Sequence, residues 1–142
     1  MKTVQQILDA KPSQIFSVAE HSSVLAGLQL MMEKNVSALL IVSGDVLTGI
    51  FTERDYARKI VLHGKSSAET SISEVMTANP ITVVPTDSIE HCMQIMTDKH
   101  IRHLPIMRSG QLLGMVSIGD LVKFIIADQK QTISQLESYI SS

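Results

Sequence analysis

The sequence predicts an α+β protein built from two copies of one β-α-β-β-α unit. The chain matches itself without gaps at an offset of 65 residues, which pairs Gly49 with Gly114 and Asp55 with Asp120. The same offset aligns further identical residues, among them Ile7 with Ile72, Val18 with Val83, Met31 with Met96 and Leu39 with Leu104. An internal repeat of this kind decides the architecture. Because a small sheet alone leaves one face uncovered, we expect the copies to pack together through their sheets.

Composition limits the class of protein. A chain of 142 residues with 44% hydrophobic and 18% charged residues has the size and balance of one globular domain, and it contains no apolar run of membrane-spanning length. The net charge of −2, with both signs interspersed, gives no basic surface for nucleic acid. The start of the chain lacks the apolar core of a secretory signal and Cys92 is the only cysteine, so we expect a cytoplasmic protein without a membrane partner.

The first half of each copy contains a helical turn, a short strand and a helix. Capping-box patterns at 3–6 and 71–74 indicate that each copy begins with a helical turn. The β-rich runs "IFSV" at 15–18 and "ITVV" at 81–84 follow. Amphipathic patterns then predict helices over 22–34 and 87–99, the second with a capping signal from Asp87 and Glu90. We interpret the methionines on their apolar sides as core residues, namely Met31, Met93 and Met96.

The second half of each copy contains two strands and a closing helix. Apolar runs at 38–42 and 46–51 are separated by "SGD", and those at 103–107 and 111–116 by "RSG", which are turn sequences suited to hairpins. A helical pattern follows each hairpin. These elements divide the chain into repeat 1 (7–63), a linker (64–70), repeat 2 (71–128) and a helical tail (129–142).

The tail carries an apolar stripe. Ile126, Ile133 and Ile140 are seven residues apart, and Leu136 lies between the last two. A stripe this short does not form a stable coiled coil alone, so the tail either folds back on its own module or forms a dimer contact. We favour a homodimer.

A polar pair recurs where each closing helix begins. "GIFTERD" places Thr52 three residues before Asp55, and "GMVSIGD" places Ser117 three residues before Asp120. One interpretation is helix capping, which is worth about 1 kcal/mol. The other is ligand binding, because a carboxylate at a helix start can accept both ribose hydroxyls of a nucleotide, and nearby cations can bind its phosphates. The candidate cations are Arg54, Arg58, Arg102 and His103. The pattern alone leaves both interpretations open.

The duplication, the two polar motifs and "RHLPIM" together resemble a cystathionine-β-synthase (CBS) domain pair, or Bateman module, and the resemblance covers almost the whole chain. It implies a stand-alone two-CBS protein with pseudo-twofold symmetry and two clefts between the repeats. Such clefts bind adenosyl ligands, namely AMP, ADP, ATP, NAD(H) or S-adenosylmethionine, and binding regulates rather than catalyses.

The resemblance also implies which residues form the clefts. One cleft would combine Thr52, Arg54 and Asp55 with Ile81, Ile101, Arg102 and His103. The other would combine Ser117 and Asp120 with Phe16, Val36, Ser37 and Ala38. Because Gly119 stands where the first repeat has Arg54, we expect the Asp55 cleft to prefer the larger or more phosphorylated ligand.

The sequence therefore predicts an adenine-nucleotide-binding sensor module that signals to a partner protein whose identity the residues do not reveal. The alternative is a dimeric interaction or scaffold module with vestigial clefts, in which Asp55 and Asp120 serve as helix caps only. We rank an enzyme last, because no nucleophile, general base or metal constellation is present; His100 and His103 lack a third ligand.

Overall fold

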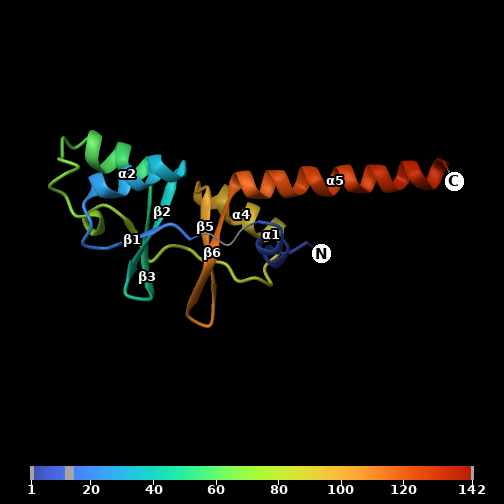
Figure 1. The fold of residues 1–142 in the computed structure, drawn as a ribbon, viewed down its shortest axis with the longest axis horizontal. Helices are drawn as coiled ribbons and strands as arrows, with labels where there is room; N and C mark the ends of the chain where they lie inside the picture. The colour runs from blue at the N-terminus through green and yellow to red at the C-terminus, as the bar shows by residue number, and fades with distance from the viewer. Residues whose placement is uncertain (1, 12–14, 142) are drawn as a thin grey trace.

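The structure, a computed structural model, describes residues 2–11 and 15–141, and only the backbone of the last three of these. Two units, each a small sheet with helices, lie side by side, and a long helix, α5 (Ile118–Ser141), runs from the second unit well beyond the body of the molecule (Figure 1). This arrangement confirms the predicted α+β fold with two packed copies of one unit.

The first unit contains one parallel and two antiparallel strand pairs in one sheet of order β1-β2-β3-β4. Strand β1 is parallel to β2, with Val18 opposite Ile41, while β2 and β3 form the antiparallel hairpin that the "SGD" turn predicts. A short α3 and a π-helical segment, η1, close the unit. The bounds are β1 Ser17–Ala19, α2 Val24–Lys34, β2 Ala38–Ser43, β3 Val46–Thr52, α3 Glu53–Asp55, η1 Tyr56–Val61 and β4 Thr77–Ala78.

The second unit repeats the hairpin but not the first strand. The elements are α4 Ile89–Lys99, β5 His103–Arg108, β6 Gln111–Ser117 and α5. The prediction of a strand over 81–84 is wrong, because only Val83 pairs, as a single parallel bridge to Ile106. Pro80 and Pro85 flank this stretch and cannot donate backbone hydrogen bonds, which keeps the ladder to one residue.

The helix starts agree only partly with the predicted caps. The first capping box is confirmed, since the Thr3 amide donates to Gln6 Oε1 at 2.9 Å. The box over 71–74 is wrong: the Ser71 hydroxyl donates to Glu20 O, just after β1, and the turn that follows, η2 (Ile72–Glu74), is a single 3₁₀ turn. Ser88 caps α4, while the Asp87 carboxylate accepts from an earlier amide, so the cap lies one residue later than predicted.

The methionine prediction is correct for two residues of three. Met31 and Met96 are buried in the two main cores. Met93 is 36% exposed, because the inward face of α4 is formed by Ile89, Cys92 and Met96. Met93 lies about 100° around the helix from Cys92 and therefore at the edge of that face.

The two units exchange the segments that precede them in the sequence. Helix α1 (Val4–Ala10) inserts Val4 and Ile7 into the core of the second unit, and the Val4 amide donates to Asp87 O at 2.9 Å. In the same way, Ile72 and Val75 complete the core of the first unit. Each core is therefore closed by a piece of chain that belongs to the other unit by position.

The glycines of the two motifs lie where these exchanged segments cross the sheets. A Cβ on Gly49 would collide with the Met76 side chain and come within 3.0 Å of Thr77 O. A Cβ on Gly114 would meet only the end of the Leu8 side chain, at 3.3 Å. The exchanged segment thus passes so close to the motif glycine that it leaves little room for a side chain, and the space is tighter at Gly49 than at Gly114.

A third, smaller core joins the two sheets. It is formed by Ala38, Leu40 and Ile50 of the first unit, and side chains of both hairpins pack against it, namely Leu47, Leu112 and Met115. This contact confirms that the units pack through their sheets. Among the residues that the structure describes, no helix is long and apolar enough to cross a membrane.

Candidate functional site

The polar pair of the first repeat is a capping box. Thr52 is the N-cap of α3, its hydroxyl accepts from the Asp55 amide at 3.2 Å, and its own amide donates to Asp55 Oδ2 at 3.0 Å. The capping interpretation is thus confirmed here. It does not by itself exclude ligand binding, because a carboxylate has a second oxygen.

The second oxygen of Asp55 is also engaged. Oδ1 accepts from the Thr77 hydroxyl at 3.1 Å and lies 3.1 Å from the Lys59 ammonium, and the residue is only 8% exposed. Lys59 donates further to Val75 O at 2.9 Å. Asp55 therefore fastens the exchanged segment of η2 and β4 to the first unit, in addition to capping the helix.

The polar pair of the second repeat has a different environment. The Ser117 amide donates to Asp120 Oδ2 at 2.8 Å, and the Asp120 amide donates to the Ser117 hydroxyl at 3.1 Å. The Lys11 ammonium lies 2.9 Å from the same Oδ2 and donates to Met115 O at 2.6 Å. The Asp120 side chain is 26% exposed, against 10% for Asp55. Asp120 is thus the more accessible of the two carboxylates.

Charge and burial oppose each other at Asp120. Burial raises the pKa of its carboxyl, but hydrogen bonds and charge from Lys11, with the hydrogen bonds from Ser117, outweigh burial and hold the pKa below its usual range. Sequence reasoning missed Lys11, since it lies outside both motifs and the repeat aligns it with Met76. Only the exchange of α1 brings this lysine to the second repeat.

Contacts between the repeats join several of the predicted site residues. The Ser37 hydroxyl lies 3.2 Å from His103 Nε2, and Arg54 donates to His100 O at 2.5 Å. Burial is the main cause that lowers the pKa of His103; Arg102 adds to it, while Asp120 and Glu53 oppose it. The sequence assigned Ser37 and His103 to different clefts, whereas the structure brings them together at the junction of the two units.

This junction is pseudo-symmetric at the level of the backbone. The Glu53 amide donates to Ser37 O at 3.2 Å, and the Ile118 amide donates to Arg102 O at 2.9 Å. Both members of the second pair lie 65 residues after those of the first. Each closing helix therefore starts beside the residue that precedes the first hairpin strand of its own unit.

The remaining predicted residues have different surroundings. Phe16 and Val36 pack against the first core, and Ala38 is buried between the sheets. Ile101 packs against the second core, while Ile81 and Arg102 are exposed.

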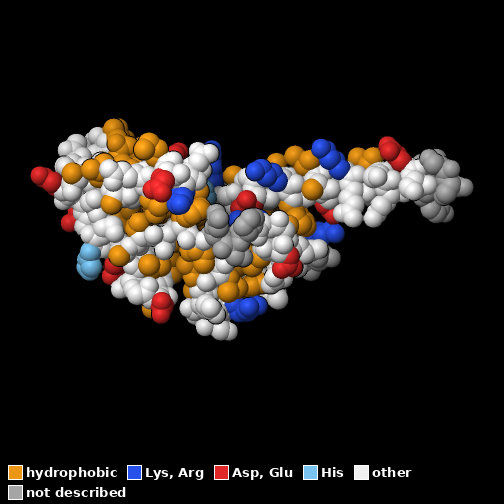
Figure 2. All heavy atoms as spheres, in the orientation of Figure 1, with side chains coloured by type: hydrophobic (Ala, Val, Ile, Leu, Met, Phe, Trp, Pro, Cys, Tyr) orange, Lys and Arg blue, Asp and Glu red, His pale blue; other side chains and the backbone are white. Residues whose placement is uncertain are grey.

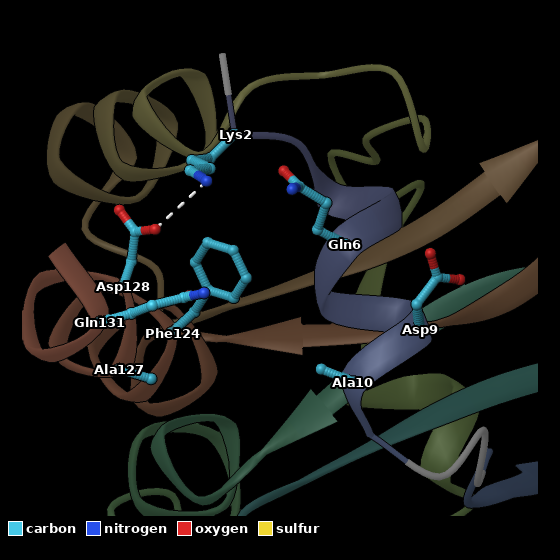
Figure 3. Close-up of a pocket in the computed structure, with 8 residues that line it drawn as sticks. All are labelled: Lys2, Gln6, Asp9, Ala10, Phe124, Ala127, Asp128 and Gln131. Atoms are coloured by element: carbon cyan, nitrogen blue, oxygen red, sulfur yellow. Dashed lines mark ion pairs between the residues drawn. The ribbon is translucent and has the colours of Figure 1, made fainter. Parts of the chain in front are cut away.

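Two open hollows on the surface lie away from the polar pairs. One, of about 430 Å³, lies between α1 and α5 and is shown in Figure 3, where Lys2 of the N-terminal segment faces Asp128 of α5 at 3.2 Å. The other, of about 580 Å³, lies between the tips of the two hairpins, around Gly44 and Gly110. Neither is lined by Asp55 or Asp120, so the candidate site is a junction of polar groups rather than one of these hollows.

Comparison with known proteins places these features in a family. The CBS domain family matches the chain twice, over residues 7–62 and 72–127. A solved structure from Burkholderia ambifaria, described as a candidate signal-transduction protein with CBS domains, is 50% identical, with a TM-score of 0.87 over 90% of this chain and 96% of that one.

Curated relatives agree with this match. The CBS domain-containing protein CBSX3, mitochondrial, of Arabidopsis thaliana is 39% identical over 83% of this chain, which spans 60% of that protein's length. The CBS domain-containing protein YhcV of Bacillus subtilis is 32% identical over 83% of this chain and 84% of its own.

Proposed function

Because the chain belongs to the CBS-domain family, whose pairs are generally regulatory modules, we propose that it binds an adenosyl ligand between its repeats and signals this binding to a partner protein. The ligand classes are those expected from the sequence: AMP, ADP, ATP, NAD(H) or S-adenosylmethionine, as a regulatory ligand and not a catalytic cofactor. The observation that carries the proposal is the polar pair, which recurs at equivalent helix starts on either side of one junction between the units.

The Asp120 side of the junction offers the better ribose acceptor. Its carboxylate is partly exposed, and its pKa is held low, so it is ionised at neutral pH and able to accept from hydroxyl groups. The hydrogen bonds described for Asp120 all converge on Oδ2. Oδ1 is the oxygen that a ribose hydroxyl would reach with least rearrangement.

Polar donors beside this carboxylate suit a phosphate group. The Lys11 ammonium lies 2.9 Å from Asp120, and the charges of Asp120 and Arg102 both act on the neighbouring His103 ring. A ligand that binds Asp120 through its sugar would bring its phosphates toward these groups, where ammonium and guanidinium donors bind anions well. The proposal therefore favours phosphorylated adenosyl ligands over adenosine itself.

A thermal-shift panel tests the proposal. AMP, ADP, ATP, NAD, NADH, S-adenosylmethionine and adenosine are added to the wild type and to Asp120→Ala, Asp55→Ala and the exposed control Asp98→Ala. A ligand that binds the native state raises the melting temperature in proportion to RT ln(1 + [L]/Kd). We expect a shift with at least one phosphorylated ligand that Asp98→Ala retains and Asp120→Ala loses. No shift with any ligand would reject the proposal.

One observation favours a second function. The Asp55 carboxylate is buried and accepts from Thr52, Thr77 and Lys59, as a purely structural latch would. If both carboxylates serve in this way, the module is a dimeric scaffold with vestigial clefts. Loss of stability in both Asp→Ala variants, with no ligand response in the wild type, is the outcome that identifies the scaffold.

We further propose that the module acts as a homodimer in the cytoplasm, without nucleic acid or a membrane as partner. Dispersed charges of both signs argue against nucleic acid as a partner. The Arabidopsis relative carries a mitochondrial designation in its name, so fractionation of cells that produce the tagged protein is the appropriate check.

A further inference from the structure

Helix α5 exposes an apolar stripe along one side. Val122, Ile126, Ile133 and Leu136 are 45%, 47%, 55% and 57% exposed, which is unusual for four aliphatic side chains on one helix. The helix extends beyond the body of the molecule instead of folding back on it, so the first of the two interpretations of the tail does not hold (Figure 1). In the space-filling view, hydrophobic side chains appear along α5 (Figure 2).

The stripe does not serve the core of its own unit. Leu121 and the half-buried Phe124 and Ile125 pack inward, and Asp128 pairs with Lys2 beside the hollow of Figure 3. At 100° per residue, these positions lie on a different side of the helix from the exposed stripe. One side of α5 therefore attaches the helix to the body, while another is left for a different surface.

The spacing of the stripe is that of a coiled-coil seam. Ile126 and Ile133 occupy successive a positions of a heptad, and Val122, Gln129 and Leu136 occupy successive d positions. Such a seam is matched most simply by another seam with the same spacing. The chain itself supplies one, in a second copy of α5.

We propose that α5 pairs with α5 of a second copy in an antiparallel two-helix contact. This inference rests on the homodimer in the proposed function and names its surface. In the antiparallel register that overlaps the stripes most fully, Ile126 faces Leu136 of the second copy, and Gln129 faces Ile133 of the second copy. The bodies of the two copies then lie at opposite ends of the helix pair, where they do not compete for space.

The charges that flank the seam favour this direction. The e positions are Lys123, Lys130 and Glu137. Antiparallel pairing places e beside e, so that Lys123 faces Glu137 of the second copy and the reverse pair forms by symmetry; only Lys130 meets its like. Parallel pairing would place e beside g, where Ile125 and Thr132 carry no charge to match.

Sedimentation velocity of the full chain over a range of concentrations tests the surface. We expect a dimer for the wild type and a dissociation constant raised on the order of 100-fold in Ile133→Glu, because each dimer would then bury two charges in an apolar seam. Ser134→Glu adds the same charge one residue away, off the stripe, and should leave the constant unchanged. Far-UV circular dichroism verifies that both variants keep their helix.

The outcomes separate this inference from the homodimer itself. A monomeric wild type overturns both. A dimer that Ile133→Glu leaves intact overturns the α5 surface and leaves the homodimer to other helices.

A charge exchange tests the direction of the pair. Lys123→Glu and Glu137→Lys should each raise the dissociation constant about fivefold, and the double variant should restore it, since two flanking ion pairs are lost and then regained. If the double variant is as weak as the sum of the single changes, the antiparallel arrangement is refuted.

Discussion

Truncating the two motif carboxylates should have unequal effects on stability. Asp55→Ala removes a buried side chain that accepts from the Thr52 amide and hydroxyl, the Thr77 hydroxyl and the Lys59 ammonium. Asp120→Ala removes a partly exposed one that accepts from the Ser117 amide and the Lys11 ammonium. The prediction is that the first variant is clearly the less stable.

The magnitudes follow from these contacts. Loss of the hydrogen bond from the N-cap amide to this carboxylate costs about 1 kcal/mol at either site. At Asp55, the Thr77 hydroxyl also loses a charged acceptor in a buried setting, which costs about 1.5 kcal/mol more. Lys59 and Lys11 are partly exposed and can turn to solvent, so each broken ion pair adds about 0.5 kcal/mol at most. We therefore expect a loss of about 3 kcal/mol for Asp55→Ala and about 1.5 kcal/mol for Asp120→Ala.

Urea denaturation at pH 7 without ligand measures both values by linear extrapolation. Asp98→Ala, an exposed carboxylate on α4, is the control and should change stability by less than about 0.5 kcal/mol. If Asp120→Ala costs as much as Asp55→Ala, the latch that we assign to Asp55 is wrong. A Lys59→Met variant that matches the full loss of Asp55→Ala would instead assign the effect to the ion pair.

Three further predictions concern the same framework. In urea denaturation, Gly49→Ala should lower the free energy of unfolding by about 2 kcal/mol or more, because Met76 and a backbone carbonyl occupy the space that a Cβ would need. Gly114→Ala should cost less than half of that. Equal costs would contradict our account of the exchanged segment passing close to Gly49. Burial, with a smaller effect of the Asp87 carboxylate, raises the pKa of the Cys92 thiol to about 11. Iodoacetamide at pH 8 should therefore label this thiol only after unfolding. Prompt labelling of the native protein would show that the core opens. Burial lowers the folded-state pKa of His103, so the unfolded chain takes up its proton first. The stability that this group contributes is complete above its ordinary pKa of 6.5 and is lost as pH falls below that value, so His103→Gln should flatten the profile of stability against pH in that range.

The sequence predicts the fold well because the repeat constrains every element twice. Both hairpins and helices α2 and α4 lie where periodicity and turn residues place them, and both helices end at the predicted lysines, Lys34 and Lys99. The strand expected over 81–84 fails because apolar β-branched residues indicate burial as readily as strand, and Val83 is buried with only one paired position.

The candidate site is less accessible to sequence reasoning. Capping by Thr52 and Ser117 follows from local spacing and is present in both repeats. The lysines at the two carboxylates are not equivalent: Lys59 comes from the next turn of its own helix, while Lys11 arrives from the exchanged α1. Aligning the two repeats reveals only what they share. Lys11 reaches one repeat alone, through the exchange of α1, and therefore leaves no signal in that alignment.

The exchange of α1 and η2 also has a consequence for the order in which the protein is made. As the chain leaves the ribosome, α1 emerges before the residues of the second unit, whose core receives Val4 and Ile7. The first unit must likewise wait for Ile72 and Val75 before its own core closes. A chain cut in the linker should therefore give two fragments that are each incomplete and that recover the native structure only when mixed, so the two repeats form one indivisible folding unit.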